Sequence, residues 1–255
     1  MKKDVIAGLG EIGLPMQKLL SRAIPVVGYD KKTELMNTKK FKKFENHETE
    51  ILHICIPFTK NFHRNVISLC DKFSPKCLVI HSTIQPYITK KLQNKLTIPV
   101  IFSPTRGVHR RMLYDLKRYT KFFAIESNAP KKTWAITTYS NLMKKCGVKT
   151  KKMSDPITLE LAKIICDTSY FGWLINYAQL SKIIAIENNV DYNEMWTFSD
   201  EIHKHLGNRP KMYPGIIGGH CVIPNLDLIQ NQTLDFIKKL NKKYASKVKE
   251  RKTIQ

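Results

Sequence analysis

A glycine-rich turn near the N-terminus has the residue types and the spacing that hold a dinucleotide. The apolar run Val5–Gly8 is predicted to be a strand, and it leads straight into Gly8-Leu9-Gly10-Glu11-Ile12-Gly13, which opens a helix. In such a turn the first glycine permits the bend, the second lets the backbone approach a pyrophosphate, and the third lets the helix pack on its strand. Unpaired N–H groups at the helix start favour phosphate. We expect all six residues to contact a dinucleotide; a glycine turn without a ligand is the alternative.

An acidic residue stands where such a site needs one. A second predicted strand ends in Gly28-Tyr29-Asp30, roughly 20 residues beyond the turn. The Asp30 carboxylate could accept hydrogen bonds from both hydroxyls of an adenosine ribose, and it would repel a 2′-phosphate. Lys31 and Lys32 follow directly and could hold a phosphate, which weakens the preference. The sequence favours NAD over NADP, with Asp30 and Lys31 as cofactor contacts.

A cysteine follows paired glycines in the loop Gly218-Gly219-His220-Cys221. Glycines bring the backbone close to whatever the thiol faces. A thiolate there could attack an aldehyde, giving a thiohemiacetal that delivers hydride and becomes a thioester. The same loop fits a buried structural cysteine equally well. His220 could lower the pKa of the thiol as an imidazolium, or it could be a spacing residue.

Together with other segments, these motifs resemble the UDP-glucose/GDP-mannose dehydrogenase family over nearly the whole chain. Six motifs occur in the family's order: Gly13-Leu14-Pro15, Cys55-Ile56-Pro57, Ser82-Thr83, Ser103-Pro104-Thr105-Arg106, Glu160-Leu161-Ala162-Lys163 and Gly218-Gly219-His220-Cys221. The resemblance implies NAD-dependent oxidation of a sugar-nucleotide alcohol to the acid, in two steps through a covalent thiohemiacetal and thioester.

The resemblance also implies roles for individual residues. Cys221 would be the nucleophile, and Lys163 would be the cation that steadies developing oxyanions. Thr83 would orient water beside the nicotinamide. The segments Ile56-Pro57 and Ser82-Thr83 would line the cofactor, and substrate would contact four positions: Thr105, Arg106, Gly219 and His220.

The first departure from the family pattern is a reciprocal pair of residues. Four residues after the lysine the family has Asn, and here Asp167 stands there; four after the cysteine it has Asp, and here Asn225 stands there. If both line one site, the pair still supplies one carboxylate and one amide. We therefore hypothesise that Asp167 takes over the orienting or basic role of the family's aspartate. Chance divergence at two degraded positions is the alternative.

Two further departures put the full reaction in doubt. The family's glutamate in the turn after Pro104 is Thr105, and a threonine cannot act as a base near neutral pH. The family continues into a third domain that grips the substrate's nucleotide, whereas only residues 222–255 follow the cysteine here. We therefore expect a truncated member with an altered, still anionic substrate. The alternative is a catalytically reduced NAD-binding protein of the same superfamily, which senses or sequesters the cofactor.

The formal net charge is +22, with 43 basic and 21 acidic residues. Arg106 can clamp an anion with its bidentate guanidinium, and His109, Arg110 and Arg111 either join it or are surface charges. The charge agrees with an anionic small-molecule substrate. Nucleic acid is disfavoured, because the basic residues are mostly lysines spread along the chain and no recognisable nucleic-acid module occurs.

The six cysteines form no CxxC pair, and the histidines show no metal-ligand spacing, so no metal is proposed. The sequence lacks a signal peptide and an apolar run long enough to span a membrane. We expect a cytoplasmic protein with free thiols that does not associate with a membrane.

The chain is organised into two expected domains. Residues 1–152 alternate short apolar runs with helical patterns, which is typical of a Rossmann-type, doubly wound parallel sheet. Residues 153–255 are predicted to be a helical domain built on one long helix, 156–188, which begins at Asp155 and Pro156. A helix that long needs burial, so we expect a homodimer through it. A second helix near 191–206, the cysteine loop and a basic C-terminal helix follow.

The first domain is expected to contain six strands and the helices that connect them. The expected strands are 5–8, 25–29, 51–56, 77–81, 99–102 and 122–125, and the expected helices are 14–22, 62–73, 88–96 and 131–145.

Overall fold

The computed structural model of the chain describes residues 1–170, 178, 181–182, 184–207, 216–217 and 232–253. The chain divides into two compact units, Met1–Gln179 and Leu180–Gln255. Each is described here by itself.

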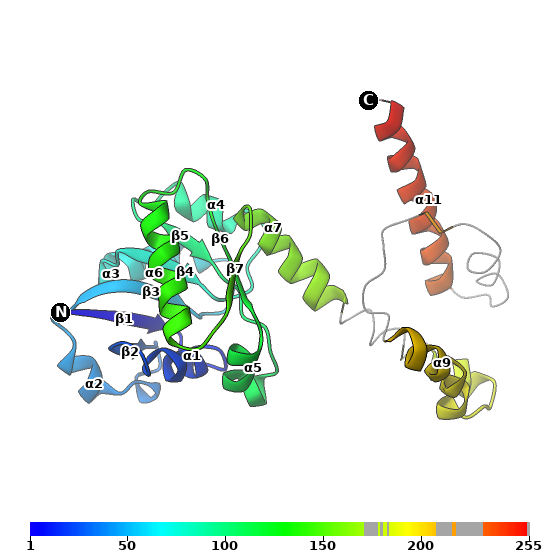
Figure 1. Cartoon of the computed structure of the whole chain (residues 1–255), viewed down its shortest axis with the longest axis horizontal. Coiled ribbons are helices and arrows are strands. Elements are labelled where there is room, and N and C mark those ends of the chain that lie inside the picture. The colour runs from blue at the N-terminus through cyan, green and yellow to red at the C-terminus, as the bar shows by residue number, and fades with distance from the viewer. Residues whose placement is uncertain (171–177, 179–180, 183, 208–215, 218–231, 254–255) are drawn as a thin grey trace. The chain divides into compact units, whose positions relative to one another are not determined.

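The first unit is built on a seven-stranded sheet (Figure 1). Its strands are β1 (Lys2–Ala7), β2 (Val26–Tyr29), β3 (Glu48–Ile54), β4 (Cys77–Ile80), β5 (Val100–Phe102), β6 (Lys121–Ile125) and β7 (Thr150–Lys152). Their spatial order is β2-β1-β3-β4-β5-β6-β7. The neighbours from β2 to β5 pair in parallel, and the order reverses between β1 and β3. In such sheets ligands bind beyond the carboxyl ends of the strands at this reversal.

Helices cover both faces of the sheet. They are α1 (Gly13–Leu20), α2 (Thr38–Lys43), α3 (Phe62–Phe73), α4 (Ile88–Gln93), α5 (Met112–Arg118), α6 (Lys132–Lys145) and α7 (Pro156–Leu161). Buried side chains of α1, α5 and α6 pack in one core cluster, and those of α3, α4 and α7 pack in the other. The arrangement is a Rossmann-type doubly wound fold, as the sequence predicts.

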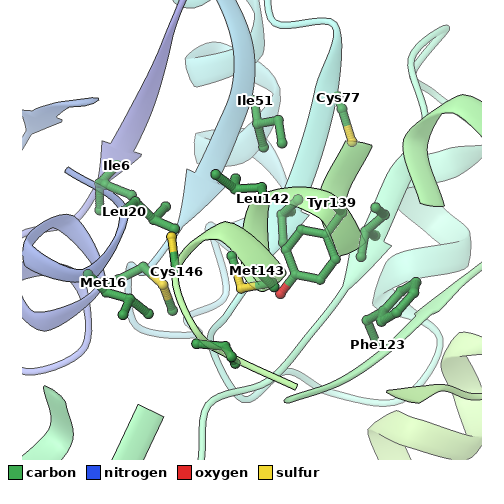
Figure 2. Packing of buried hydrophobic residues seen from close by; sticks show 14 of the residues in the cluster. Ile6, Met16, Leu20, Ile51, Cys77, Phe123, Tyr139, Leu142, Met143 and Cys146 are labelled. Carbon is green, nitrogen blue, oxygen red and sulfur yellow. The ribbon is translucent and has the colours of Figure 1, made fainter. Parts of the chain in front are cut away.

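The first core cluster shows why the sheet and α6 hold together. Figure 2 shows the ring of Tyr139 among the apolar side chains of this cluster. Its centroid lies 5.3 Å from that of Phe123, edge to face, and its hydroxyl donates to Ser103 Oγ at 2.8 Å. A buried tyrosine needs such a partner for its hydroxyl. The contact fixes α6 over the end of β5.

Six of the seven strands occupy predicted positions, with ends that shift by up to a few residues. The seventh, β7, was not predicted, because Thr-Lys-Lys carries no apolar signal. The helices α2 and α5 were also missed. The last two strands run against the others, since β6 pairs with β5 antiparallel while β7 pairs with β6 in parallel. As a result β6 begins at the edge where β5 ends.

The segment after β7 begins as the sequence predicts. Pro156 is the first residue of α7, and the Asp155 carboxylate accepts a hydrogen bond from the Thr158 N–H at 2.8 Å. A π-helix, Ala162–Ser169, follows directly. The described residues between 170 and 187 are helical, and the others of the predicted long helix lie outside the described residues. Residues 153–179 belong to the first compact unit by their contacts, and the predicted domain boundary near residue 152 stays a prediction.

Besides the described helical residues between 181 and 187, the second unit contains the helices α9 (Tyr192–Leu206) and α11 (Gln232–Thr253). Asp191 caps α9 by accepting from the Glu194 N–H at 2.8 Å, where the sequence predicts a helix start. The Asn241 side chain of α11 bonds both the N–H and the carbonyl of Ile217, at 2.8 and 2.9 Å. None of the described helices has the length and apolar character of a membrane-spanning segment.

Candidate functional site

The glycine turn lies at the reversal of strand order, where β1 ends. Gly8 has a φ of +93°, and a Cβ there would lie 2.9 Å from the backbone of Cys55. A Cβ on Gly13 would lie 1.7 Å from the Gly8 carbonyl oxygen, so only glycine lets α1 start this close to β1. A Cβ on Gly10 would meet nothing within 4 Å. The first and third glycines are thus required by packing, and the second faces open space in which a ligand can approach.

Asp30 is held against this turn. Its Oδ2 accepts a hydrogen bond from the Leu9 N–H at 2.7 Å, and its Oδ1 accepts one from the Lys32 N–H at 2.9 Å. Each oxygen keeps a further lone pair, because a carboxylate offers about four acceptor sites. The side chain is half-buried, whereas Lys31 is exposed. The carboxylate therefore lies beside the glycine turn, oriented before any ligand arrives.

The neighbouring strand ends are bonded to each other. The Ser82 hydroxyl, just after β4, donates to the Ile56 carbonyl, just after β3, at 2.6 Å. Pro57 and Thr83 are exposed next to this bond. These four predicted cofactor contacts lie at the carboxyl ends of β3 and β4, the edge at which the glycine turn leaves β1.

The turn after β5 contains two predicted substrate contacts, Thr105 and Arg106, whose surroundings differ. Thr105 is buried, and its N–H donates to the His81 carbonyl at 3.1 Å. Arg106 turns back onto β6: its Nη2 donates to the Thr120 carbonyl at 2.8 Å, and its guanidinium lies 5.0 Å from the Phe122 ring centroid. In this structure Arg106 fastens the turn to β6.

The sequence did not predict the buried lysine that contacts the turn after β5. The Nζ of Lys121, the first residue of β6, donates to the carbonyls of Ser103 and Pro104 at 2.8 and 3.1 Å and to Thr105 Oγ1 at 3.3 Å. Only 5% of the residue is exposed. Burial lowers the pKa of Lys121 to about 7, and the charges of Arg106 and Lys163 act in the same direction. The period-two alternation of β6 could have revealed it, because positions 121, 123 and 125 share one face and the last two are apolar.

Lys163 and Asp167 are brought together by the π-helix. The Lys163 ammonium forms an ion pair with the Asp167 carboxylate, and their side chains are 12% and 44% exposed. Single π-helical turns inside α-helices are often found at functional sites. The orienting or basic role that the sequence assigns to Asp167 stays a prediction.

The cysteine loop lies outside the described residues. This applies to the predicted nucleophile Cys221, to Asn225, and to the predicted substrate contacts Gly219 and His220. Their roles, and the exchange of Asp167 and Asn225, stay predictions. Among the described thiols, Cys55 is closest in sequence to the predicted cofactor contacts, and burial raises its pKa to about 12.

The other basic residues of the loop after β5 line a groove that does not include Thr105. His109, Arg110 and Arg111 form a short 3-10 helix. With Lys18 and Arg22 of α1 and with Lys117 of α5 they line a groove of about 520 Å³. His109 Nδ1 lies 2.6 Å from the Glu11 carboxylate, and this contact ties the loop to the glycine turn. Within the described part of the chain, no cluster of three His, Cys, Asp or Glu side chains could hold a metal ion.

A row of buried polar groups crosses the sheet behind this edge. His81 Nδ1 lies 3.0 Å from the Ser103 carbonyl, His81 Nε2 lies 2.9 Å from His53 Nδ1, and His53 Nε2 lies 3.2 Å from Asp4 Oδ2. Burial lowers the pKa of His81 well below its usual value, so its ring is neutral. The carbonyl only accepts, so His81 donates through Nδ1 and accepts through Nε2. His53 Nδ1 is then the donor to His81 Nε2.

Comparisons with known proteins support the fold. No protein-family model matches the chain, and no curated protein matches it. Solved structures do. A UDP-D-ManNAc dehydrogenase from Pyrococcus horikoshii superposes with a TM-score of 0.64 at 18% identity, over 96% of this chain and 69% of that chain. A UDP-N-acetyl-mannosamine dehydrogenase from Staphylococcus aureus gives 0.59 at 16% identity, over 97% and 69%. A reductive aminase from Aspergillus terreus, in complex with NADPH, gives 0.62 at 10% identity, over 96% and 94%. At these identities the likeness establishes a shared fold.

Proposed function

We propose that this chain is an NAD-dependent dehydrogenase that oxidises an alcohol of an anionic sugar or sugar-nucleotide substrate. The observation that carries the proposal is the glycine turn at the reversal of strand order, with Gly8 and Gly13 required by packing and Asp30 already oriented beside it. Two structural neighbours, both dehydrogenases of a UDP-linked sugar, support this substrate class.

The residues present fit a dinucleotide. The Gly8–Gly13 turn and the start of α1 would hold the pyrophosphate, and Asp30 would accept hydrogen bonds from the adenosine ribose. When bound, NAD accepts a hydride from the carbon that is oxidised. Thr83 and Ser82 would lie beside the nicotinamide. The Lys163 ammonium would stabilise the developing oxyanion, and its ion pair with the Asp167 carboxylate would orient it.

The cysteine belongs to the proposal as a second step. Attack of the Cys221 thiolate on the aldehyde formed first, with uptake of a proton, would give a thiohemiacetal, and transfer of its hydride to a second NAD with loss of the hydroxyl proton would leave a thioester. By the resemblance, Thr105 would replace the base that assists hydrolysis of that thioester, so a single two-electron oxidation is the simpler outcome. A screen of sugar nucleotides and sugar phosphates for NADH formation, repeated with Cys221→Ala, tests the reaction class. Turnover that persists undiminished in this variant would remove the cysteine from the mechanism.

The preference for NAD has its own test. We expect NAD to bind at least about tenfold more tightly than NADP, a difference of about 1.4 kcal/mol. Asp30→Asn keeps an acceptor for the Leu9 N–H but removes the negative charge. It should therefore reduce the preference for NAD over NADP, mainly by improving NADP binding. Glu34→Gln, which also removes one negative charge but at an exposed position assigned no contact with the cofactor, is the matched control. Titration calorimetry measures the affinities of the three proteins for both cofactors, and equal affinities for NAD and NADP in the wild type would contradict the assignment.

A second candidate function is an NAD-binding protein with reduced catalysis. The observation that favours it is the turn after β5, where a buried threonine replaces a possible base and Arg106 is bonded to Thr120 and stacked on Phe122. Cofactor binding without turnover on any tested substrate, together with a Cys221 thiol whose alkylation rate NAD leaves unchanged, would favour this candidate over the dehydrogenase.

We also propose that the chain forms a homodimer through the 156–188 segment. Leu161 and Ile165, four residues apart, are 44% and 57% exposed in the single chain. A second copy would cover these apolar side chains. Analytical ultracentrifugation should therefore show a dimer for the wild type and a monomer for Ile165→Glu, whereas Glu187→Lys, a charge change at an exposed position of the same segment, should leave the dimer intact.

A further inference from the structure

The feature that the proposed reaction leaves unused is the buried ammonium of Lys121. Its three hydrogens meet three oxygens, those of the Ser103 carbonyl, the Pro104 carbonyl and the Thr105 hydroxyl. Within the described part of the chain no carboxylate forms an ion pair with it. Two of its partners are carbonyls that can only accept, and the third can both accept and donate.

Because only the Thr105 hydroxyl can both accept and donate, it is the partner that must change its role when Lys121 gains or loses a proton. As an ammonium, Lys121 donates to Thr105 Oγ1, and the hydrogen of that hydroxyl is free to point elsewhere. As an amine, Lys121 has two hydrogens, which the two carbonyls take, and its lone pair then faces Thr105. The bond survives only if the hydroxyl turns and donates to the amine.

We propose that Lys121 is a positioning residue of the candidate site: loss of its proton reverses its hydrogen bond to Thr105 and withdraws a hydroxyl donor from the edge where substrate is expected to bind. The inference rests on the proposed function only for the consequence at the substrate. The reversal of the hydrogen bond is a property of the protein without ligands.

The surroundings of Lys121 make it the group that changes charge near neutral pH. Burial lowers its pKa to about 7, and the cations Arg106 and Lys163 add to this effect, whereas only an ionised Cys55 would oppose it. Burial raises the pKa values of Cys55 and Tyr139 and lowers that of His81, so all three are neutral near pH 7. The ends of β3 and β4, the turn after β5, the helix α6 and the π-helix contribute these groups, and on the π-helix the Asp167 carboxylate forms an ion pair with Lys163.

Nuclear magnetic resonance of the full chain without ligands tests the reversal directly. With labelled lysine side chains and threonine methyl groups, one lysine should titrate near pH 7 and disappear from the spectrum of Lys121→Met. The Thr105 methyl should shift with the same midpoint. Thr89 is the internal control, because its buried hydroxyl donates to the Glu160 carboxylate at 2.6 Å and should not follow. A Lys121 that stays protonated at pH 9, or a stationary Thr105 while Lys121 titrates, would overturn the proposal.

Two variants separate positioning from simple support of the fold. Thr105→Ser keeps a hydroxyl and should leave the pH midpoint of the Lys121 titration unchanged. Thr105→Val removes one acceptor from the ammonium and should lower this midpoint. On a substrate found by the screen, the KM of the wild type should rise about fivefold as the pH increases through the midpoint of the Lys121 titration. The KM of Thr105→Val should not depend on pH in this range. Failure of NAD binding with the resonance results intact would refute the proposed function and leave this inference standing.

Discussion

The substitution Gly13→Ala tests whether the glycine turn is fixed by packing. The new Cβ would lie 1.7 Å from the Gly8 carbonyl oxygen, and real Cβ atoms essentially never come closer than 3.0 Å to another heavy atom. The start of α1 must therefore move away from β1 by more than an ångström. That movement would loosen Met16, Leu19 and Leu20, which α1 buries completely against the sheet.

The size of the effect follows from two opposing contributions. Forcing an extra methyl group into a packed interior costs about 1–3 kcal/mol. Replacing glycine by alanine stabilises by up to about 1 kcal/mol through the unfolded chain and helix propensity. With a contact this short, the upper end of the packing cost applies, so we expect a net loss of about 2 kcal/mol. For a unit of this size that lowers Tm by about 6 °C.

Gly10→Ala is the matched control. A Cβ there meets no atom within 4 Å, so this variant should be as stable as the wild type or slightly more stable. It should nevertheless bind NAD more weakly, because the methyl group occupies the space through which a pyrophosphate approaches. Thermal and urea unfolding of the three proteins measure stability, and calorimetry measures NAD binding to Gly10→Ala. A Gly13→Ala protein as stable as Gly10→Ala would refute the packing argument.

Three other predictions follow from buried polar groups. Glu160→Gln should lower the unfolding free energy by about 2 kcal/mol in urea, since one amide oxygen cannot replace a carboxylate that accepts from the Tyr87 N–H, the Thr89 N–H and the Thr89 hydroxyl. Tyr139→Phe should cost about 1 kcal/mol by the same assay, because the Ser103 Oγ loses its donor. Between pH 7 and 9 the stability of the wild type should rise relative to Lys121→Met by up to about 1.4 kcal/mol per pH unit, because the unfolded chain retains a proton that the folded one has released. Parallel pH profiles of these two proteins would show that Lys121 keeps its usual pKa.

The sequence predicted those parts of the fold in which local pattern and tertiary structure agree. Phe62–Phe73 is a helix with the predicted bounds, because its apolar residues repeat with helical spacing and bury one face. The glycine turn was predictable because Gly8 and Gly13 each have a steric requirement that no other residue meets.

What the sequence could not predict depends on contacts between distant residues. Lys121 reads locally as one more surface lysine, and it is buried only because β6 runs antiparallel to β5 and starts beside Ser103 and Thr105. Arg106 has the side chain for an anion clamp, yet a backbone carbonyl and two rings in the fold already engage it. No local pattern encodes either pairing.

The margin of the sheet at β7 has a consequence for the behaviour of the protein in concentrated solution. A terminal strand leaves main-chain donors and acceptors open to a strand of another molecule, which is how sheets join into aggregates. Here the terminal strand is only Thr150–Lys152, and Lys151 and Lys152 are both exposed. A second copy that approached along this strand would bring four like charges together, so the lysines keep the strand from templating fibrous assembly.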